Sequence, residues 1–264
     1  MNLLKNIAIW LSGNFFMQRL LQKNFEITSY LMGIGAGANV KEGGELILVK
    51  KIIESQLNKA VIFDVGANIG DFSNLIINGL IGKLDIELHS FEPSKVTFNK
   101  LEKNVKPDKN IFLNNLALGN KKGEVELFFD EACSGLASLT KRKLDHFNIK
   151  FNLSEKVIID TLDNYCNSNN IQNIDLLKID VEGHELDVLQ GSVEMFSNRQ
   201  IKMVSFEFGG TNIDTRTYYR DLYYFFDNYK MKIYRITPSA MLIPMNEYNE
   251  MYEQFRTTNF LALR

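Results

Sequence analysis

The sequence predicts an α/β fold built on a mostly parallel sheet, and two observations support this prediction. From residue 60 onward, short apolar runs suited to buried strands alternate with segments whose apolar residues recur at helical spacing. This alternation is typical of a parallel sheet, because the chain needs a crossover to begin each new strand at the same edge. The chain also has 264 residues, 45% of them apolar, which is enough to bury a core without cross-links.

The expected elements follow one another in a regular order. Buried strands are expected at residues 60–64, 86–91, 111–118, 175–180 and 202–208. Helices are expected at residues 72–80, 95–105 and 185–196. Added strands are expected at 123–129 and 156–160, and a closing antiparallel hairpin at 231–236 and 259–264. Aromatic residues between 218 and 229 recur at intervals of three and four, which favours a core-facing helix over an aromatic binding platform.

Residues 1–45 are predicted to form a helical extension, and residues 46–264 the main domain. The apolar residues of the extension that fall near helical spacing are Leu4, Ile7, Leu11, Phe15, Phe16 and Leu20. Such a helix is expected to pack on the body or on a second subunit of a homo-oligomer, with peripheral contact to a membrane as the alternative. No apolar run approaches the ~20 residues needed to span a bilayer.

Composition limits the classes of partner. Thirty basic and thirty-two acidic residues give a net charge of −2, whereas a nucleic-acid-binding surface needs concentrated positive charge. We therefore expect a small-molecule or glycan partner and no nucleic acid. Cys133 and Cys166 lack the spacing of metal ligands and the number of a disulfide framework, so free thiols in a reducing cytoplasm are expected.

The most informative segment is VIFDVGANIGDFS, residues 61–73. A buried strand ends at Asp64, and a tight turn containing Gly66, Asn68 and Gly70 leads into a helix. Glycines let the backbone approach a ligand closely, and the start of a helix offers free N–H groups. An acid before the turn is poorly placed for a pyrophosphate but suits a cationic group, such as the ammonium of an amino acid.

A second acid follows the next expected strand. Glu92 lies twenty-two residues beyond Gly70, in the sequence Phe91-Glu92-Pro93. A carboxylate at this position can accept both hydroxyls of a ribose, although it can also cap a turn. The two segments together predict a pocket for a nucleoside that carries an amino acid. S-adenosylmethionine fits that description better than NAD.

A third segment, LLKIDVEGHELDVLQG at residues 176–191, places Asp180, Glu182 and His184 after another strand. Ligands of open α/β sheets bind beyond the carboxyl ends of the strands, so these side chains are expected in the same crevice. Acids clustered beside a histidine can supply a general base. Two alternatives remain: a divalent metal held by Asp180, Glu182 and Glu207, and a histidine without a catalytic role.

Six segments in this order resemble the FkbM-type methyltransferases, a branch of the S-adenosylmethionine-dependent class I methyltransferases. They are DVGANIGDFS, FEPS, NNLALG, SGLASL, IDTLDNY and KIDVEGHELDVLQG. The resemblance runs from about residue 60 to the C-terminal NFLALR. It implies a Rossmann-like, doubly wound, seven-stranded sheet with a final antiparallel hairpin. It also implies methylation of hydroxyl oxygens on sugars and natural-product scaffolds.

The resemblance further implies roles for individual residues. Those implied to bind the cofactor are Asp64, Gly66, Asn68 and Gly70 at its amino-acid end, Glu92 with Pro93 at the ribose, Asn115 and Ala117 near the adenine, and Asp180 between the methionine moiety and the acceptor. Asp180 and His184, with Glu182 third, are the candidate bases, and no metal is assigned. The glycines at 33, 35 and 37 are expected in a loop that covers the pocket, and contact of Glu45 with the ligand is left open.

The expected function is methyl transfer from S-adenosylmethionine to a hydroxyl, first of all on a sugar of a bacterial surface glycan. A small natural-product scaffold is the alternative acceptor. A non-catalytic protein that binds S-adenosylmethionine would keep Asp64 and Glu92 but lack a base. An NAD-dependent oxidoreductase would need a nicotinamide pocket, for which the sequence has no signature.

Overall fold

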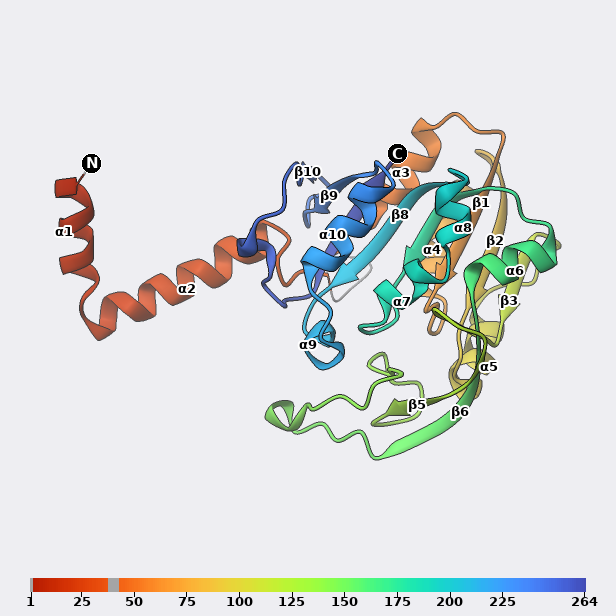
Figure 1. Ribbon diagram of the computed structural model, residues 1–264, viewed down its shortest axis with the longest axis horizontal. Helices are drawn as coiled ribbons and strands as arrows, with labels where there is room; N and C mark the ends of the chain where they lie inside the picture. Colours follow the sequence, from red (N-terminus) through yellow and green to blue (C-terminus); the bar gives the residue numbers. More distant parts are fainter. Residues whose placement is uncertain (1, 38–42) are drawn as a thin grey trace.

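The computed structural model describes residues 2–37 and 43–264 and confirms an α/β fold (Figure 1). Its main sheet has eight strands in the order β10-β9-β11-β8-β7-β1-β2-β3. The strands are β1 Lys59–Val65, β2 Asp85–Phe91, β3 Ile111–Asn114, β7 Ile174–Ile179, β8 Ile201–Phe208, β9 Lys232–Ile236, β10 Leu242–Pro244 and β11 Thr258–Leu263. Neighbours from β3 through β1 and β7 to β8 are parallel.

The C-terminal strands close the sheet as expected, because β11 pairs antiparallel with both β8 and β9. The sheet nevertheless has one strand more than the seven that were expected. The extra strand, β10, pairs antiparallel with β9 over three residues. Its run Leu242-Ile243-Pro244 is too short to show a periodic pattern, and it ends in proline, which is found in sheets at edge strands.

Helices cover both faces of the sheet. They are α3 Leu46–Glu54, α4 Asp71–Leu80, α5 Lys95–Asn104, α6 Leu162–Asn169, α7 Glu185–Gln190, α8 Val193–Ser197, α9 Thr211–Thr215 and α10 Tyr219–Asn228. Two short 3₁₀ turns lie at Asp145–Phe147 and Glu250–Tyr252. Helices α3 and α4 form one apolar cluster with Ile62 of β1, while α6, α7, α8 and α10 form another with Phe63. Adjacent strand residues therefore serve opposite faces, as a doubly wound sheet requires.

Helix α10 confirms the core-facing interpretation of the aromatic residues between 218 and 229. Its residues Tyr219, Leu222 and Phe226 are fully buried and belong to the apolar cluster on that face.

The run 111–118 is not one strand. It splits into β3 and β4 (Ala117–Leu118), and β4 joins a second sheet with β5 (Gly123–Phe129) and β6 (Leu153–Asp160) in the order β4-β6-β5. The side chain of Asn115 explains the break, because its Nδ2 donates to the carbonyls of Glu92 and Pro93 at 3.0 and 2.7 Å and redirects the chain. The expected strands 123–129 and 156–160 pair antiparallel within this sheet.

The helix expected over 185–196 is likewise divided, into α7 and α8. The break lies at Gly191, where a Cβ would stand 1.9 Å from the carbonyl oxygen of Gly119. The junction of α7 and α8 therefore lies directly against the backbone that follows β4.

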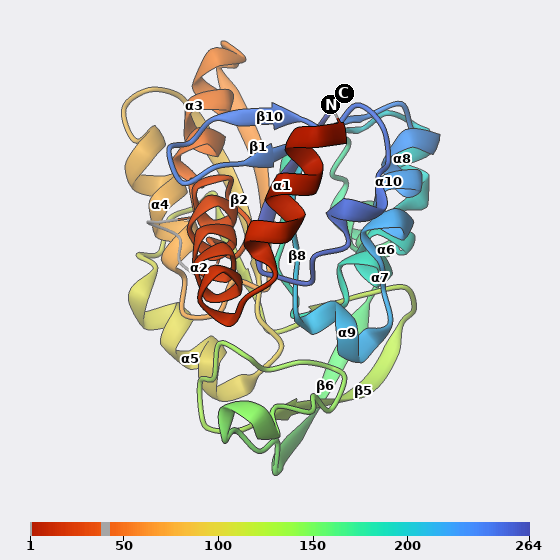
Figure 2. The ribbon, with the colours of Figure 1, turned by 90° about the vertical axis from the view of Figure 1, so that its left-hand side faces the viewer.

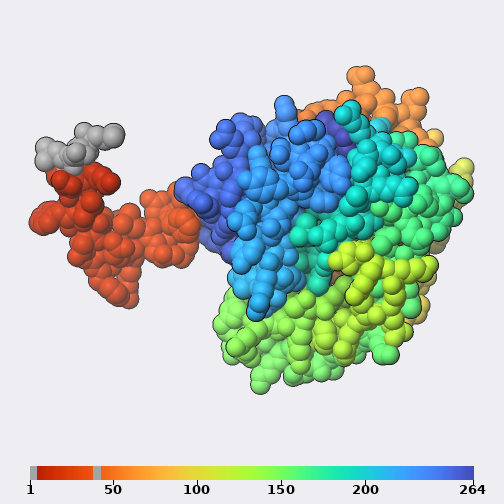
Figure 3. Space-filling view, in the orientation of Figure 1, coloured from red at the N-terminus to blue at the C-terminus, as the bar shows by residue number. Residues whose placement is uncertain are grey.

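The N-terminal arm, residues 2–31, consists of two helices that project from the body (Figures 1 and 3). They are α1 Asn2–Ser12 and α2 Phe15–Leu31, separated at Gly13 and Asn14, where the Asn14 side chain accepts from Met17 N at 3.0 Å and caps α2. Figure 2 views the arm in front of the sheet. Large apolar side chains are exposed on it, including Trp10, which is 80% exposed. None of the helices in the described part of the chain is both long and apolar enough to cross a membrane.

The strap, defined as residues 33–37 and 43–45, joins the arm to α3. Residues 38–42 of the glycine-rich segment lie outside the described residues. The strap is attached to the C-terminal strands, because the N–H groups of Gly35 and Gly37 both donate to the carbonyl of Thr257 at 3.0 Å. The proposed domain boundary at residue 45 stays a prediction.

Candidate active site

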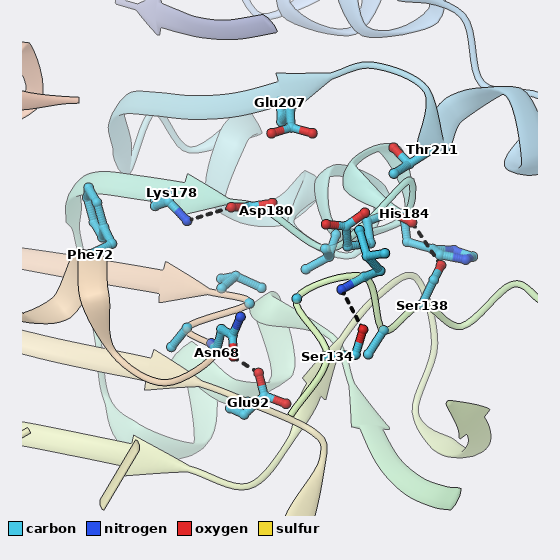
Figure 4. Close-up of a pocket in the computed structure, with 18 of the residues that line it drawn as sticks. Asn68, Phe72, Glu92, Ser134, Ser138, Lys178, Asp180, His184, Glu207 and Thr211 are labelled. Atoms are coloured by element: carbon cyan, nitrogen blue, oxygen red, sulfur yellow. Dashed lines mark hydrogen bonds and ion pairs between the residues drawn. The ribbon is translucent and has the colours of Figure 1, made fainter. Parts of the chain in front are cut away.

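A cavity of about 1220 Å³ opens at the carboxyl ends of β1, β2, β7 and β8 (Figure 4). Residues at the ends of these strands line it, among them Gly66, Glu92, Asp180 and Glu207. The β5–β6 side of the molecule and the strap complete the wall, through residues such as Leu127 and Gly35. Its position matches the general rule that open α/β sheets bind ligands beyond the carboxyl ends of their strands.

The turn between β1 and α4 is attached to both neighbouring strands. The N–H groups of Gly66 and Ala67 donate to the carbonyl of Phe91 on β2, at 3.0 and 2.9 Å. On the other side, a Cβ on Gly66 would stand 1.8 Å from the carbonyl oxygen of Asp180. Glycine is therefore favoured at position 66 for two reasons: its φ of +83° is left-handed, and there is no room for a Cβ. Asn68 lines the cavity, whereas Gly70 lies behind it.

Asp64 lies behind the wall of the cavity rather than in it. Its carboxylate is fully buried and accepts from Ser73 Oγ of α4 at 2.7 Å. Its other oxygen stands 3.7 Å from Lys178 Nζ. Burial raises the pKa of Asp64, and Lys178 opposes the rise. Asp64 thus anchors the start of α4 and does not line the cavity, and the direct contact with the ligand that the resemblance implied stays a prediction.

Glu92 lines the cavity and holds the turn that precedes α4. Its Oε2 accepts from the N–H of Asn68 at 3.1 Å, and its Oε1 accepts from the N–H of Ser94 at 2.9 Å. The side chain is 7% exposed, and burial raises the pKa of Glu92 to about 7. Each carboxylate oxygen can accept two hydrogen bonds, so each retains capacity for a ligand hydroxyl.

Apolar residues follow Glu92 along the cavity. Pro93, Leu116, Ala117 and Leu118 line this end together with Leu127 of the second sheet. Asn115 does not line the cavity; as described above, it fixes the backbone between them. The structure therefore brings Glu92, Pro93 and Ala117 together in the cavity wall. Asn115 lies outside the wall and holds the backbone of Glu92 and Pro93 in place.

Lys178 is a buried cation that the sequence interpretation did not single out. It is 5% exposed, and its Nζ lies 3.1 Å from Asp180 Oδ2 and 5.1 Å from the ring centre of Phe72. Burial lowers the pKa of Lys178, but Asp180, Asp64 and Glu45 together raise it above its ordinary value. One signal was available: the buried strand β7 contains two charged residues, Asp175 and Lys178, and a charge in a buried strand needs a partner.

Asp180, Glu182 and His184 all line the cavity, so the three candidate bases do meet in one place. Their surroundings differ. The side chain of Asp180 is 39% exposed, whereas those of Glu182 and His184 are 18% and 15% exposed. Glu182 Oε2 accepts from Arg142 Nη1 at 2.8 Å, and burial and Asp180 raise the pKa of Glu182.

Both ring nitrogens of His184 are engaged. Its Nδ1 lies 2.6 Å from Asp187 Oδ2, and its Nε2 lies 3.0 Å from Thr140 Oγ1. The carboxylate of Asp187 fixes the orientation of the ring through Nδ1. The hydroxyl of Thr140 contacts the other nitrogen, Nε2. Asp180 is therefore the most accessible of the three candidates.

Glu207 and Glu45 are two more carboxylates in the cavity wall. Burial raises the pKa of Glu207 well above its usual range, and Asp180 and Glu182 add to the rise. The metal alternative rested on Asp180 and Glu182, with Glu207 as an optional third ligand. Within residues 2–37 and 43–264, no group of three His, Cys, Asp or Glu side chains is arranged to hold a metal ion.

Polar loops at residues 134–139 and 209–217 contribute to the wall of the cavity. Ser134, Ser138 and Thr211 line it (Figure 4). Ser138 Oγ donates to the carbonyl of Glu182 at 2.8 Å, which ties this loop to the turn that carries the candidate bases.

Comparison with solved structures gives low sequence identity throughout. The methyltransferase FkbM from Methylobacillus flagellatus is 15% identical, with a TM-score of 0.48, and the match covers 78% of this chain and 44% of that one. The precorrin-6y C5,15-methyltransferase from Geobacter metallireducens is 12% identical, with a TM-score of 0.40, over 84% of this chain and 88% of that one. The SAM-dependent methyltransferase from Agrobacterium tumefaciens is 7% identical, with a TM-score of 0.45, over 86% and 62%.

The chain thus spans less than half of the Methylobacillus protein. No curated protein matches it. The family profile described as Methyltransferase FkbM domain, however, matches residues 64–233, which is more than half of the sequence. This match begins at Asp64, near the end of β1, and contains all of β2, β7 and β8. The chain belongs to the FkbM family of methyltransferases.

Proposed function

We propose that this methyltransferase uses S-adenosylmethionine to methylate a hydroxyl oxygen, first of all on a sugar of a bacterial surface glycan. The observation that carries the proposal is the composition of the cavity. One side has a buried carboxylate beside an apolar channel, which suits a nucleoside. The opposite side has hydroxyl, carboxylate and guanidinium groups, which suit a sugar.

The residues present fit S-adenosylmethionine. Glu92 retains acceptor capacity for the two ribose hydroxyls, and Ala117 with Leu116 and Leu118 offers an apolar surface for the adenine. Among the described residues, Asn68 Oδ1 is buried without a hydrogen-bond partner, and a donor on the ligand would satisfy it. The cavity of about 1220 Å³ also exceeds the roughly 300–1,000 Å³ of a typical small-molecule site, which leaves room for an acceptor.

When bound, S-adenosylmethionine supplies an electrophilic methyl group. The task of the chain is then to orient the acceptor hydroxyl, exclude water and receive one proton. The Asp180 carboxylate is the proposed acceptor of that proton, because it is the most exposed of the three candidates. Its Oδ2 is bound to Lys178, so the proton would go to Oδ1. His184 is second, since Thr140 covers its Nε2, and Glu182 is third, since Arg142 neutralises it.

A sugar acceptor is supported by the polar loops of the cavity wall. Ser134, Ser138 and Thr211 offer hydroxyl groups, and Arg142 offers a guanidinium that is already paired with Glu182. A small natural-product scaffold remains the alternative acceptor, and a largely apolar scaffold would find fewer matching contacts here.

The test combines binding and turnover in Asp180→Asn. Turnover is measured as release of S-adenosylhomocysteine with a panel of free, nucleotide-linked and oligomeric sugars. If Asp180 receives the proton, turnover falls by about 100-fold or more, while the dissociation constant for S-adenosylmethionine changes little. The matched control is Asp85→Asn, at the exposed start of β2 on the opposite edge of the sheet. Loss of cofactor binding with a proportional loss of turnover would show instead that Asp180 is a cofactor ligand.

We also propose that the N-terminal arm contacts an anionic membrane surface in the cytoplasm. Residues 2–31 carry Lys5, Arg19 and Lys23 against Glu26, whereas the whole chain has a net charge of −2. Helices that bind at a membrane interface combine basic residues with exposed apolar side chains, and both helices of the arm also carry exposed apolar side chains. The two cysteines are free thiols, which suits a reducing compartment.

The test is flotation of the protein with lipid vesicles. We expect the protein to float with anionic vesicles and not with neutral ones, and the double variant Arg19→Glu, Lys23→Glu to lose this binding. Self-association of the protein without binding to vesicles would indicate instead that the arm contacts a second subunit.

A further inference from the structure

Glu45 is a buried carboxylate in the cavity wall that lies outside the three sequence segments discussed above. It is 5% exposed, and it stands directly before α3, at the N-cap position. An N-cap side chain usually accepts from the first turn of its helix, but Glu45 makes no such bond. Its Oε2 is buried without a hydrogen-bond partner among the described residues. A buried acceptor in this state is costly unless a ligand supplies a donor.

The position of Glu45 is enforced by the strap. A Cβ on Gly44 would stand 2.3 Å from the carbonyl oxygen of Thr237, and one on Gly33 would stand 2.3 Å from that of Ile236. Both glycines have positive φ, at +76° and +93°. The strap therefore packs directly against the backbone after β9, at a distance that only glycine allows. Such contacts hold the carboxylate of Glu45 at the cavity and leave it little freedom to move away.

The charges around Glu45 favour a cationic ligand. Burial raises the pKa of Glu45 to about 7, Lys178 opposes the rise, and Asp180 and Asp64 add to it. The negative charges of Asp180, Asp64 and Glu45 therefore all act on the ammonium of Lys178, which lines this corner of the cavity. A further positive charge would reduce the excess of negative charge in this corner and favour the ionised form of Glu45.

We propose that Glu45 binds the α-ammonium of the cofactor's amino-acid moiety, which places the methionine end of S-adenosylmethionine under the strap. This inference rests on the proposed function and adds a residue to it. Two groups of the cofactor carry positive charge, the α-ammonium and the sulfonium. Glu45 Oε2 lacks a hydrogen-bond donor, and the ammonium can supply one whereas the sulfonium cannot. The ribose is assigned to Glu92, whose hydrogen bonds are made to the backbone of the β1–α4 turn and of α5.

The experiment compares two ligands that differ in the amino-acid moiety. S-adenosylhomocysteine carries it, and 5′-methylthioadenosine has the same nucleoside and a thioether but no amino acid. Calorimetric titration of the full chain is expected to show that Glu45→Gln weakens S-adenosylhomocysteine by about tenfold to a hundredfold, the range of a charged hydrogen bond. Binding of 5′-methylthioadenosine should change less than about twofold, which also shows that the variant is folded.

Two control variants frame this result. Glu92→Gln should weaken both ligands, because it acts on the nucleoside, and Glu54→Gln on the exposed side of α3 should weaken neither. Equal losses for both ligands in Glu45→Gln, or no loss for S-adenosylhomocysteine, would overturn the role of Glu45 and leave the proposed function standing. Failure of the unaltered protein to bind either ligand would instead overturn the proposed function, and the role of Glu45 with it.

Discussion

The two ends of the cavity hold their carboxylates by different means. At the strap end, Asp64 and Asp180 lie within 4 Å of the ammonium of Lys178, and the negative charge of Glu45 also acts on it. At the nucleoside end, Glu92 has no cation within 4 Å among the described residues and is held by two backbone N–H groups. The carboxylates at the strap end are therefore stabilised by the charge of a side chain, and the carboxylate at the nucleoside end by hydrogen bonds from the backbone.

This difference predicts how each end responds to substitution. Removing one side chain can unbalance the strap end, since its negative groups share a cation. The donors to Glu92 belong to the backbone, so they cannot be removed by substitution and depend instead on the path of the β1–α4 turn. The nucleoside end is therefore expected to be sensitive to glycine replacements, and the strap end to charge replacements.

The largest effect is expected for Lys178→Met. The variant leaves Asp64 buried beside Asp180 without the cation that both approach, and breaking a buried pair in this way costs about 3–5 kcal/mol of unfolding free energy. Urea denaturation at pH 7 measures it, with Lys202→Met as the control, since Lys202 is half exposed and binds Asp175 outside the cavity. A loss below about 1 kcal/mol would mean that water or rearrangement replaces the cation, and the comparison would fail.

Gly66→Ala should have the next largest effect and acts on the backbone-held end. The new Cβ collides with Asp180 O and the residue is forced into a left-handed conformation, a strain of about 1–3 kcal/mol before the collision is counted. Gly82→Ala is a matched control, because Gly82 has φ +72° with open space around it. The difference between the two midpoints of thermal unfolding isolates the collision. Equal shifts would show that the turn can move away from Asp180.

Ser73→Ala removes one hydrogen bond from Asp64 and leaves Lys178 in place. The expected loss is about 1–2 kcal/mol, smaller than for Lys178→Met, because the cation still neutralises the carboxylate. Denaturation of both single variants and of the double variant gives the coupling between them. Purely additive losses would show that the two contacts act on Asp64 independently.

The nucleoside end should also make the free energy of unfolding depend on pH. Burial raises the pKa of Glu92 from 4.5 to about 7, so the folded protein binds more protons than the unfolded chain between these values. This contribution to stability is complete below about pH 4.5 and is lost as the pH rises through 7. Glu92→Gln cannot ionise and removes this slope, so the difference in stability between the variant and the unaltered protein should shift in favour of the variant from pH 5 to pH 8. Parallel thermal midpoints over that range would contradict the burial argument.

The sequence predicted the strands that position the site because their apolar runs are long and separated by clear turns. It placed Glu92, Asp180, Glu182 and His184 near one another through the rule that strand ends share an edge, and all four line the cavity. It did not place Asp64 behind the wall, because the partners that bury it, Ser73 and Lys178, come from two other elements.

Other features depended on contacts between distant segments. The split of the run 111–118 follows from the hydrogen bonds of Asn115 to the turn after β2, which a local pattern does not contain. The burial of Glu45 follows from the packing of the strap on residues about 200 positions away, so the glycine-rich segment could raise the question of its contact with the ligand but could not answer it. The arm was correctly predicted as helical, although its break at Gly13 was not expected.

The strap also has a consequence for the order of folding. The side chain of Asn259 donates to the carbonyl of Gly43 across 216 positions of sequence, and contacts of such long range form late because the loop they close is large. The parallel strands and the glycine turn can assemble before β11 is in place, whereas the corner around Glu45 cannot. We therefore expect the ability to bind an amino-acid-bearing nucleoside to appear in the last kinetic phase of refolding, after most of the secondary structure has formed.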